Sequence, residues 1–162
     1  MISEHTDSVR SARSTAAPLH LFYRRSAKRF MIERRNRAME FEVTTSKHVD
    51  IVDITDRVAE HAENAETTCT VFVPHTTAGV VVNEDERRLR SDFKTLLSRL
   101  VPRGDDYSHD QLDGNADAHL RSMLLGEHVT VPVEDGELLL GTWQSILFVD
   151  CDGPRTRRIV VR

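Results

Sequence analysis

Residues 67–84 read TTCTVFVPHTTAGVVVNE, and this stretch decides the fold class. Its first half is rich in β-branched residues and predicts a buried strand that ends at His75. Residues 79–84, which begin with the flexible Gly79, predict a second short strand. We therefore expect a protein built on β-sheet, with a histidine at the end of one strand.

The same kinds of pattern continue on both sides of this stretch. Residues 39–45 alternate in polarity, with Phe41 and Val43 on one face, and predict a strand. Further strands are predicted over residues 48–55, 128–133 and 156–162, with one long or two short strands over 137–150. The total is about seven or eight strands.

Helical spacing predicts about three helices between these strands. One covers residues 56–64, and another covers roughly 84–100, where Asn83 and Glu86 have the spacing of a capping box. Asn115 is expected to cap a third helix. Strands and helices in this order predict a single α+β domain built mainly on antiparallel sheet.

Residues 1–38 differ in composition from the rest. They carry nine Lys/Arg and three Asp/Glu, a net charge of +6, whereas residues 39–162 carry −10. An acidic body repels phosphate backbones, so we expect no nucleic-acid partner. We interpret 1–38 as a disordered extension or a start-site artefact, with a basic tail or a targeting peptide as alternatives.

Cys69 and Cys151 are the two cysteines, and they are not in C-x-x-C spacing. Without a secretory signal, they favour a reducing compartment, so the expected location is cytoplasmic. The longest apolar runs are too short to cross a bilayer, and no membrane partner is expected.

Residues 107–127, YSHDQLDGNADAHLRSMLLGE, contain two histidines. His109 lies in the predicted loop, and His119 lies near the start of the third helix, so both could meet at one helix end. Two imidazoles there could bind a metal, or hold a phosphate when protonated. His75 could complete a three-histidine set with an open position. Solvated surface histidines are the alternative.

Residues 150–155, DCDGPR, form the other cluster with chemical potential. Asp152, Gly153 and Pro154 predict a turn, and Arg155 follows at once. Arginine suits a bidentate grip on phosphate. The flanking carboxylates could hold this arginine in place, bind Mg²⁺ or neutralise a surface strand.

Three segments together resemble one known family. PHTTAGVVVNEDE (74–86), YSHDQLDGNADAHLRSMLLGE (107–127) and VPVEDGELLLGTWQSILFVDCDGPRTRRIVV (131–161) are similar in order and spacing to the YjbQ-like proteins, also called secondary thiamine phosphate synthases. The resemblance covers about residues 39–162. It implies an α+β domain of the YjbQ-like fold that assembles as a homotrimer, with sites near subunit contacts.

The resemblance also implies which residues form the site. His75, His109, His119 and Arg155 match positions expected to be catalytic, and the three histidines are the expected metal ligands. Many relatives have glutamate where this chain has Asp150. The expected substrate-binding residues are Thr76, Thr77, Asn83, Glu84, Asn115, Gln144 and Asp152.

The implied activity is a weak or secondary thiamine phosphate synthase reaction, a transfer that belongs to thiamine biosynthesis. Hydroxymethylpyrimidine diphosphate is joined to thiazole phosphate, and pyrophosphate leaves. Arg155, protonated histidines and a divalent metal (Mg²⁺ or Zn²⁺) could stabilise the departing charge. The alternatives are a metal-dependent hydrolase of a phosphorylated small molecule and a non-catalytic trimeric metabolite-binding protein.

Overall fold

The computed structural model describes residues 38–162, except residues 64 and 66. These described residues belong to one compact unit. The interpretation of residues 1–38 as an extension lies outside the described residues, apart from Ala38.

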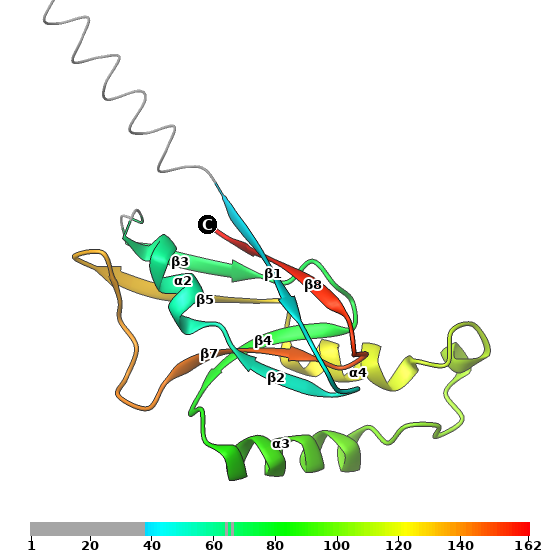
Figure 1. Ribbon diagram of the computed structural model, residues 1–162. Helices are drawn as coiled ribbons and strands as arrows, with labels where there is room; N and C mark the ends of the chain where they lie inside the picture. Colours follow the sequence, from blue (N-terminus) through cyan, green and yellow to red (C-terminus); the bar gives the residue numbers. More distant parts are fainter. Residues whose placement is uncertain (1–37, 64, 66) are drawn as a thin grey trace, which may run out of the picture. The chain divides into compact units, whose positions relative to one another are not determined.

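Pairs of consecutive strands precede the first helices of the described chain, and only strands follow the last helix (Figure 1). The helices are α2 (Thr55–Ala62), α3 (Arg87–Leu100), the short 3₁₀ helix η1 (Ser108–Gln111) and α4 (Ala116–Leu125). The strands are β1 (Met39–Thr44), β2 (Asp50–Asp53), β3 (Thr68–Phe72), β4 (Ala78–Asn83), β5 (His128–Glu134), β6 (Glu137–Leu138), β7 (Ser145–Asp150) and β8 (Thr156–Val161). The predicted α+β class is confirmed.

The strands form two antiparallel sheets. The larger sheet has the order β1-β8-β3-β5-β6, and the smaller has the order β2-β7-β4. In the larger sheet Met39 pairs with Val161, and in the smaller Ala78 pairs with Asp150. The register places Asp150 at the end of β7, where the chain turns into β8.

The main core lies between the two sheets and α2. Strand β8 shows how it is built, because Arg157, Ile159 and Val161 are buried while Arg158 between them is exposed. This period of two is that of a strand with one face on a core. Phe148 of β7 is fully buried, and burying a side chain of this size contributes about 1.5–3 kcal/mol.

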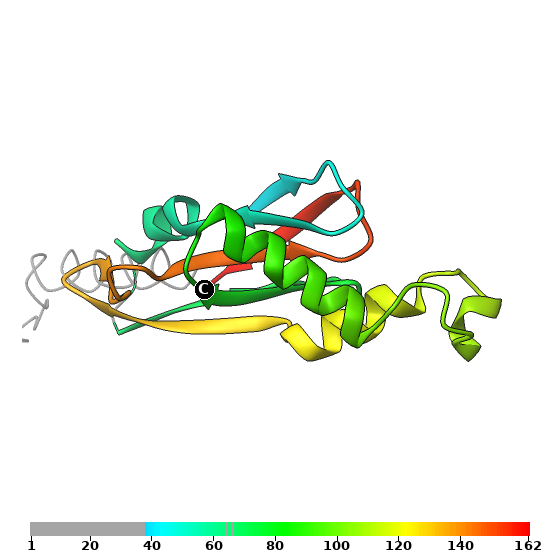
Figure 2. The ribbon, with the colours of Figure 1, turned by 90° about the horizontal axis from the view of Figure 1, so that it is seen from below.

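A second, smaller apolar cluster covers the small sheet on the side of α3 and α4. Ile51 and Val149 of the sheet pack there with Ala118 of α4, and Phe93 of α3 packs against them. Figure 2, seen from below, shows α3 running across this side of the strands. Strand β4 and the end of α4 come so close that a Cβ on Gly79 would lie 2.6 Å from Leu125 Cβ.

The helix starts differ from the prediction. The α3 capping box was wrong, because Glu86 is the N-cap and its carboxylate accepts hydrogen bonds from the backbone of Arg88 and Leu89. Asn83 instead accepts from the N–H of Glu84. Asn115 does stand at the N-cap position of α4, but its side chain makes no capping hydrogen bond. The backbone N–H of Ala116, the first residue of α4, donates to Asp110 Oδ1 at 2.8 Å.

In the described residues, no helix is long and apolar enough to span a bilayer.

Candidate functional site

The turn between β7 and β8 presents an arginine that the turn itself holds in place. Arg155 Nε donates to the carbonyl oxygen of Asp152 at 2.8 Å, and its Nη2 donates to the Asp152 carboxylate at 2.9 Å. Asn115 Nδ2 reaches the same carboxylate from α4, at 3.3 Å. The Arg155 side chain remains 54% exposed. A fixed, accessible guanidinium of this kind suits an anion.

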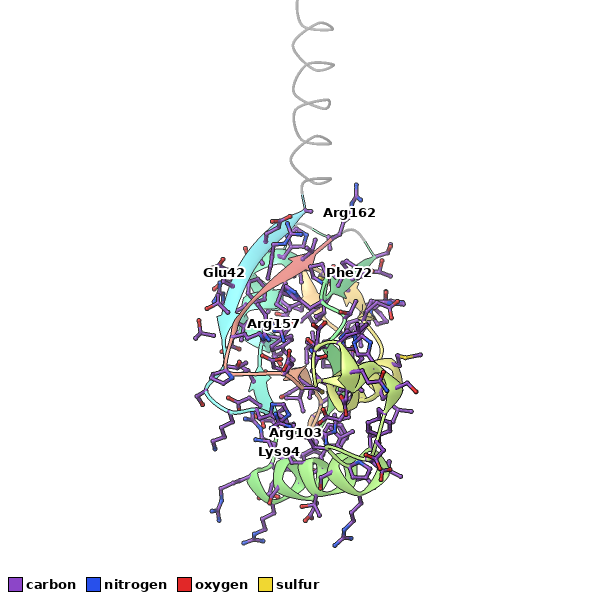
Figure 3. All side chains as sticks on the ribbon, turned by 90° about the vertical axis from the view of Figure 1, so that its right-hand side faces the viewer. Glu42, Phe72, Lys94, Arg103, Arg157 and Arg162 are labelled. Atoms are coloured by element: carbon purple, nitrogen blue, oxygen red, sulfur yellow. The ribbon has the colours of Figure 1, made fainter. Side chains whose placement is uncertain are left out.

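A second Asp–Arg pair lies beneath this turn and is buried. Arg157 Nη2 donates to Asp150 Oδ1 at 2.8 Å and to Thr77 Oγ1 at 2.9 Å. Thr45 Oγ1 donates to the other oxygen of Asp150 at 2.8 Å. In Figure 3 the Arg157 label lies near the middle of the view, and the Arg157 side chain is 8% exposed. Asp150 and Thr77 are therefore parts of the frame that supports the turn.

His75, in the loop between β3 and β4, is held by the backbone of β8. Its Nε2 accepts a hydrogen bond from the N–H of Arg158 at 2.9 Å. A neutral His75 therefore carries its proton on Nδ1. Burial, followed by the positive charge of Arg157, lowers the pKa of His75 below its ordinary value. In this arrangement the His75 ring is a hydrogen-bond acceptor at Nε2, and its Nδ1–H is the group that could donate to a ligand.

His109 and His119 lie together. Their ring centroids are 4.8 Å apart in an edge-to-face arrangement. A pocket of about 350 Å³ opens beside them, lined also by Tyr107, Ala116 and Leu120. The 3₁₀ turn η1 brings His109 to the start of α4, which carries His119. The two imidazoles that the sequence places ten residues apart thus share one small hollow.

The donor set for a metal is incomplete within one chain. Among residues 38–162 without 64 and 66, no group of three or more His, Cys, Asp and Glu side chains is arranged to hold a metal ion. His75 uses Nε2 for the Arg158 backbone, so binding a metal at Nδ1 would displace the proton described above. The described residues of one chain do not by themselves form a three-histidine metal centre, which therefore stays a prediction.

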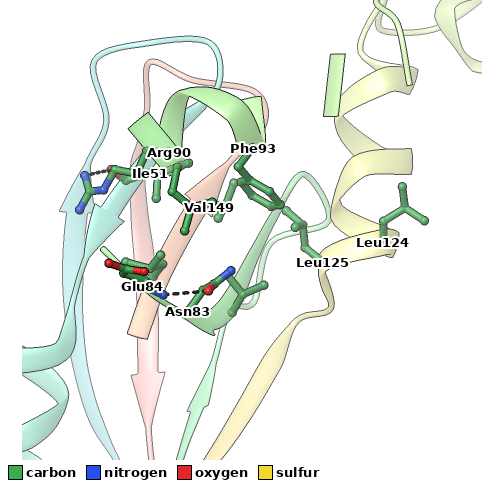
Figure 4. Close-up of a pocket in the computed structure, with 11 residues that line it drawn as sticks. Ile51, Asn83, Glu84, Arg90, Phe93, Leu124, Leu125 and Val149 are labelled. Carbon is green, nitrogen blue, oxygen red and sulfur yellow. Dashed lines mark hydrogen bonds between the residues drawn. The ribbon is translucent and has the colours of Figure 1, made fainter. Parts of the chain in front are cut away.

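Asn83 and Glu84 lie in a different hollow, between the small sheet, α3 and α4. This pocket has a volume of about 220 Å³ and is mostly apolar (Figure 4). Arg90 closes one side and donates to the carbonyl oxygen of Ile51 at 2.9 Å. The walls are Ile51, Val81, Leu89, Phe93, Leu124, Leu125, Leu147 and Val149. The cation of this pocket, Arg90, is paired with Asp85 and is less exposed than Arg155, at 28% against 54%.

The remaining predicted site residues lie at the surface. Thr76 is exposed in the loop that carries His75. Gln144 is also exposed, and its Oε1 accepts a hydrogen bond from the N–H of Gly141, so it closes its own turn. Trp143 beside it is 73% exposed. These residues are accessible, but none of them is among the described residues that line the hollow at His109 and His119.

Sequence comparison places these features in a known family. The sequence model of the YjbQ-like UPF0047 proteins matches residues 39–162. A UPF0047 protein of Archaeoglobus fulgidus is 52% identical over 124 residues, which cover 76% of this chain and 98% of that protein. The UPF0047 protein YugU of Bacillus subtilis is 33% identical over 128 residues, covering 75% and 94%. The chain belongs to the YjbQ-like UPF0047 family.

Solved structures of family members have the same fold. A hypothetical protein of Aeropyrum pernix superposes with a TM-score of 0.75 at 39% identity, covering 78% of this chain and 96% of that one. A protein of unknown function from Sulfolobus solfataricus gives 0.74 at 38% identity, covering 77% and 94%. The predicted YjbQ-like fold is thus confirmed, while these relatives carry no assigned activity.

The sequence analysis did not predict several residues that lie in the site region. Arg157 was one, although it alternates with Ile159 and Val161, so the period of the strand points it inward. Asp117 and Arg121 were two others, buried as an ion pair at 2.8 Å with i,i+4 spacing. The contact between His75 and the Arg158 backbone has no local signal, because 83 residues separate the two.

Proposed function

We propose that the chain is an enzyme that binds a phosphorylated small molecule at the Asp152–Arg155 turn. The observation that carries this proposal is Arg155, which is fixed by two hydrogen bonds yet remains half exposed. Its anchor Asp152 is tied to Asn115 at the start of α4, where His109 and His119 also lie. A guanidinium fixed in advance loses little rotamer freedom when it binds phosphate oxygens.

The finer proposal is the thiamine phosphate synthase reaction, which rests on the resemblance to secondary thiamine phosphate synthases. The bond between the pyrimidinylmethyl carbon and the diphosphate oxygen breaks, and a bond to the thiazole nitrogen forms. The electron pair of the broken bond leaves on pyrophosphate, whose added charge needs a positive partner. Arg155 would bind this leaving group, and His75 Nδ1–H would donate a hydrogen bond to one of its oxygens.

A metal-dependent hydrolase is the second candidate, favoured by the adjacent imidazoles of His109 and His119. A divalent metal (Mg²⁺ or Zn²⁺) bound there would supply Lewis acidity to a phosphorylated substrate. Metal analysis of protein purified without a histidine tag tests this candidate. Zinc at one per chain that is lost in His119→Ala supports it, while a requirement for added Mg²⁺ with no tight metal favours the transferase.

Homotrimer formation is part of the proposal, because α3 and α4 expose apolar side chains. Leu96 and Leu100 of α3 are 50% and 61% exposed, and Met123 of α4 is 79% exposed. Large apolar side chains that are this exposed on two helices are a reason to expect a protein contact. Light scattering coupled to size exclusion tests the trimer, and Leu100→Glu with Met123→Glu should shift the mass toward that of a single chain.

The decisive experiment measures binding and turnover in three proteins. Arg155→Ala should lose at least tenfold in pyrophosphate affinity and in thiamine phosphate formation. Arg158→Ala is the matched control, because Arg158 lies three residues on and its side chain is equally exposed, at 53%, but pairs with Glu40 at the sheet. If both variants lost the same affinity and turnover, or if neither lost any, the Asp152–Arg155 turn would not be the binding site. Binding without turnover would identify a non-catalytic metabolite-binding protein.

A further inference from the structure

The loop between β1 and β2 packs directly on the Asp152–Arg155 turn. The carbonyl oxygen of His48 accepts a hydrogen bond from the N–H of Gly153 at 2.9 Å. There is no room for a side chain at Gly153, because a Cβ there would overlap the carbonyl oxygen of Lys47. His48 is therefore fixed beside the turn that presents Arg155.

The His48 ring faces a buried carboxylate from α4. Its Nε2 lies 3.6 Å from Asp117 Oδ2. Both atoms are buried. Within the described part of the chain His48 Nε2 makes no hydrogen bond, and the charged partner of Asp117 Oδ2 besides His48 is the guanidinium of Arg121. Asp117 is 1% exposed, while the His48 side chain is 33% exposed. The imidazole thus spans from the buried carboxylate to the surface.

Arg121 supplies the permanent countercharge for this carboxylate. Its Nη1 lies 2.8 Å from Asp117 Oδ2, and its Nη2 donates to the carbonyl oxygen of Val101 at 2.7 Å. Arg121 is itself buried, so water cannot replace it. A buried carboxylate between a fixed guanidinium and an imidazole can orient that imidazole and balance a positive charge on it.

Asn115 adds an independent sign that a ligand group belongs here. Its Nδ2 is used by Asp152, but its Oδ1 is buried and has no hydrogen-bond donor among the described residues. A buried acceptor without a donor is costly, so it calls for a group that brings an N–H or O–H. The ligand at this turn is expected to carry a donor group next to its phosphate.

We propose that His48 and Asp117 form an acid–base dyad, and that His48 accepts a proton from a hydroxyl group or water bound at the Asp152–Arg155 turn. The O–H bond breaks and its electron pair stays on oxygen, while the proton forms a bond to His48 Nδ1. Nε2–H then donates to Asp117, whose negative charge balances the imidazolium. The inference rests on the proposed function for placing a phosphorylated ligand at this turn.

Nuclear magnetic resonance of the ¹⁵N-labelled full chain tests the dyad without any activity. An imidazole N–H held by a carboxylate gives a slowly exchanging, downfield proton resonance. We expect one that disappears in His48→Gln and shifts or disappears in Asp117→Asn. Asp113→Asn, a surface change in the loop before α4, should leave it in place. Absence of the resonance, or indifference to Asp117→Asn, overturns the dyad; thermal unfolding checks that each variant is folded.

A pair of ligands separates the dyad from the phosphate site. Methyl phosphate and 2-hydroxyethyl phosphate should both shift the Nε–H resonance of Arg155. 2-Hydroxyethyl phosphate should shift the His48 Nδ1 resonance by at least twice as much as methyl phosphate does. A response at Arg155 with equal effects at His48 overturns the catalytic role of His48. No response at Arg155 refutes the proposed phosphate site and this role with it, whatever the dyad resonance shows.

Discussion

Two Asp–Arg pairs lie within one short segment, and their surroundings are opposite. Asp150 and Arg157 are 0% and 8% exposed, whereas Asp152 and Arg155 are 15% and 54% exposed. The buried pair has every partner it needs, from Thr45 and Thr77. The exposed pair leaves part of its guanidinium free. The same chemistry therefore supports the fold in one place and offers a binding group in the other.

The largest effect is expected when the buried pair is broken. Arg157→Met leaves the Asp150 carboxylate buried without its charged partner, and breaking a buried pair in this way costs about 3–5 kcal/mol. Urea unfolding followed by circular dichroism measures the loss. The double variant Asp150→Leu, Arg157→Met should recover part of it, because no lone charge remains. This account would be contradicted if the double variant lost more free energy of unfolding than the two single variants lose together.

A smaller loss is expected at Gly153, which lies in the turn between the residues of the two pairs. A Cβ there would lie 2.8 Å from Thr45 Oγ1 and 3.2 Å from Asp150 Oδ2. Gly153→Ala should therefore destabilise by about 1–3 kcal/mol, as overpacking does. Gly141→Ala is the control, because its Cβ would meet only the flexible Gln144 side chain at 3.4 Å. Equal unfolding midpoints for the two variants would show that the turn can shift to accept a methyl group at little cost in stability.

The exposed pair should contribute little to stability. Arg155→Met is expected to change the free energy of unfolding by about 0–1 kcal/mol, because solvent screens the pair. Its thermal midpoint should stay near that of the wild type while pyrophosphate binding falls. If Arg155→Met lost as much stability as Arg157→Met, the division between a supporting pair and a binding pair would be wrong.

The smallest effect concerns pH, through the burial of His75 and then the positive charge of Arg157. The pKa of His75 is lowered in the folded state, so the unfolded chain binds the proton more readily. The stability that this preference contributes is present in full above the ordinary histidine pKa of about 6.5 and declines as pH falls through the folded value. Unfolding in EDTA at pH 7.5, 6.5 and 5.5 should show His75→Gln losing less stability on acidification than wild type. Identical slopes would remove His75 as a contributor.

Local pattern was enough to predict most of the fold. The alternation in residues 39–45 and the β-branched run ending near His75 both became strands, and each helix lies near its predicted place. The helix faces were less predictable. On α4 the apolar residues Leu120, Met123 and Leu124 are exposed, while Asp117 and Arg121 are buried. Apolar spacing shows that a helix has two faces, but only packing decides which face turns inward.

The candidate site divides in the same way. The closeness of His109 and His119 follows from a loop leading into a helix, which is local. His75 accepts a hydrogen bond from the backbone of Arg158. Asp117 lies next to His48, which belongs to the loop between β1 and β2. These contacts join segments far apart in the chain, and one sequence carries no signal for them. For the same reason, the expected metal ligands could not be tested by spacing alone.

The two free thiols offer a way to watch each half of the molecule open. Cys69 lies in the core between the sheets, and Cys151 lies in the smaller cluster under α3 and α4. Burial raises the pKa of Cys69 to about 11 and that of Cys151 to about 12. Because the thiolate is the reactive form, neither should react with an alkylating reagent until its own layer separates. The rates at which the two thiols are alkylated therefore report which of the two apolar layers opens first by local unfolding.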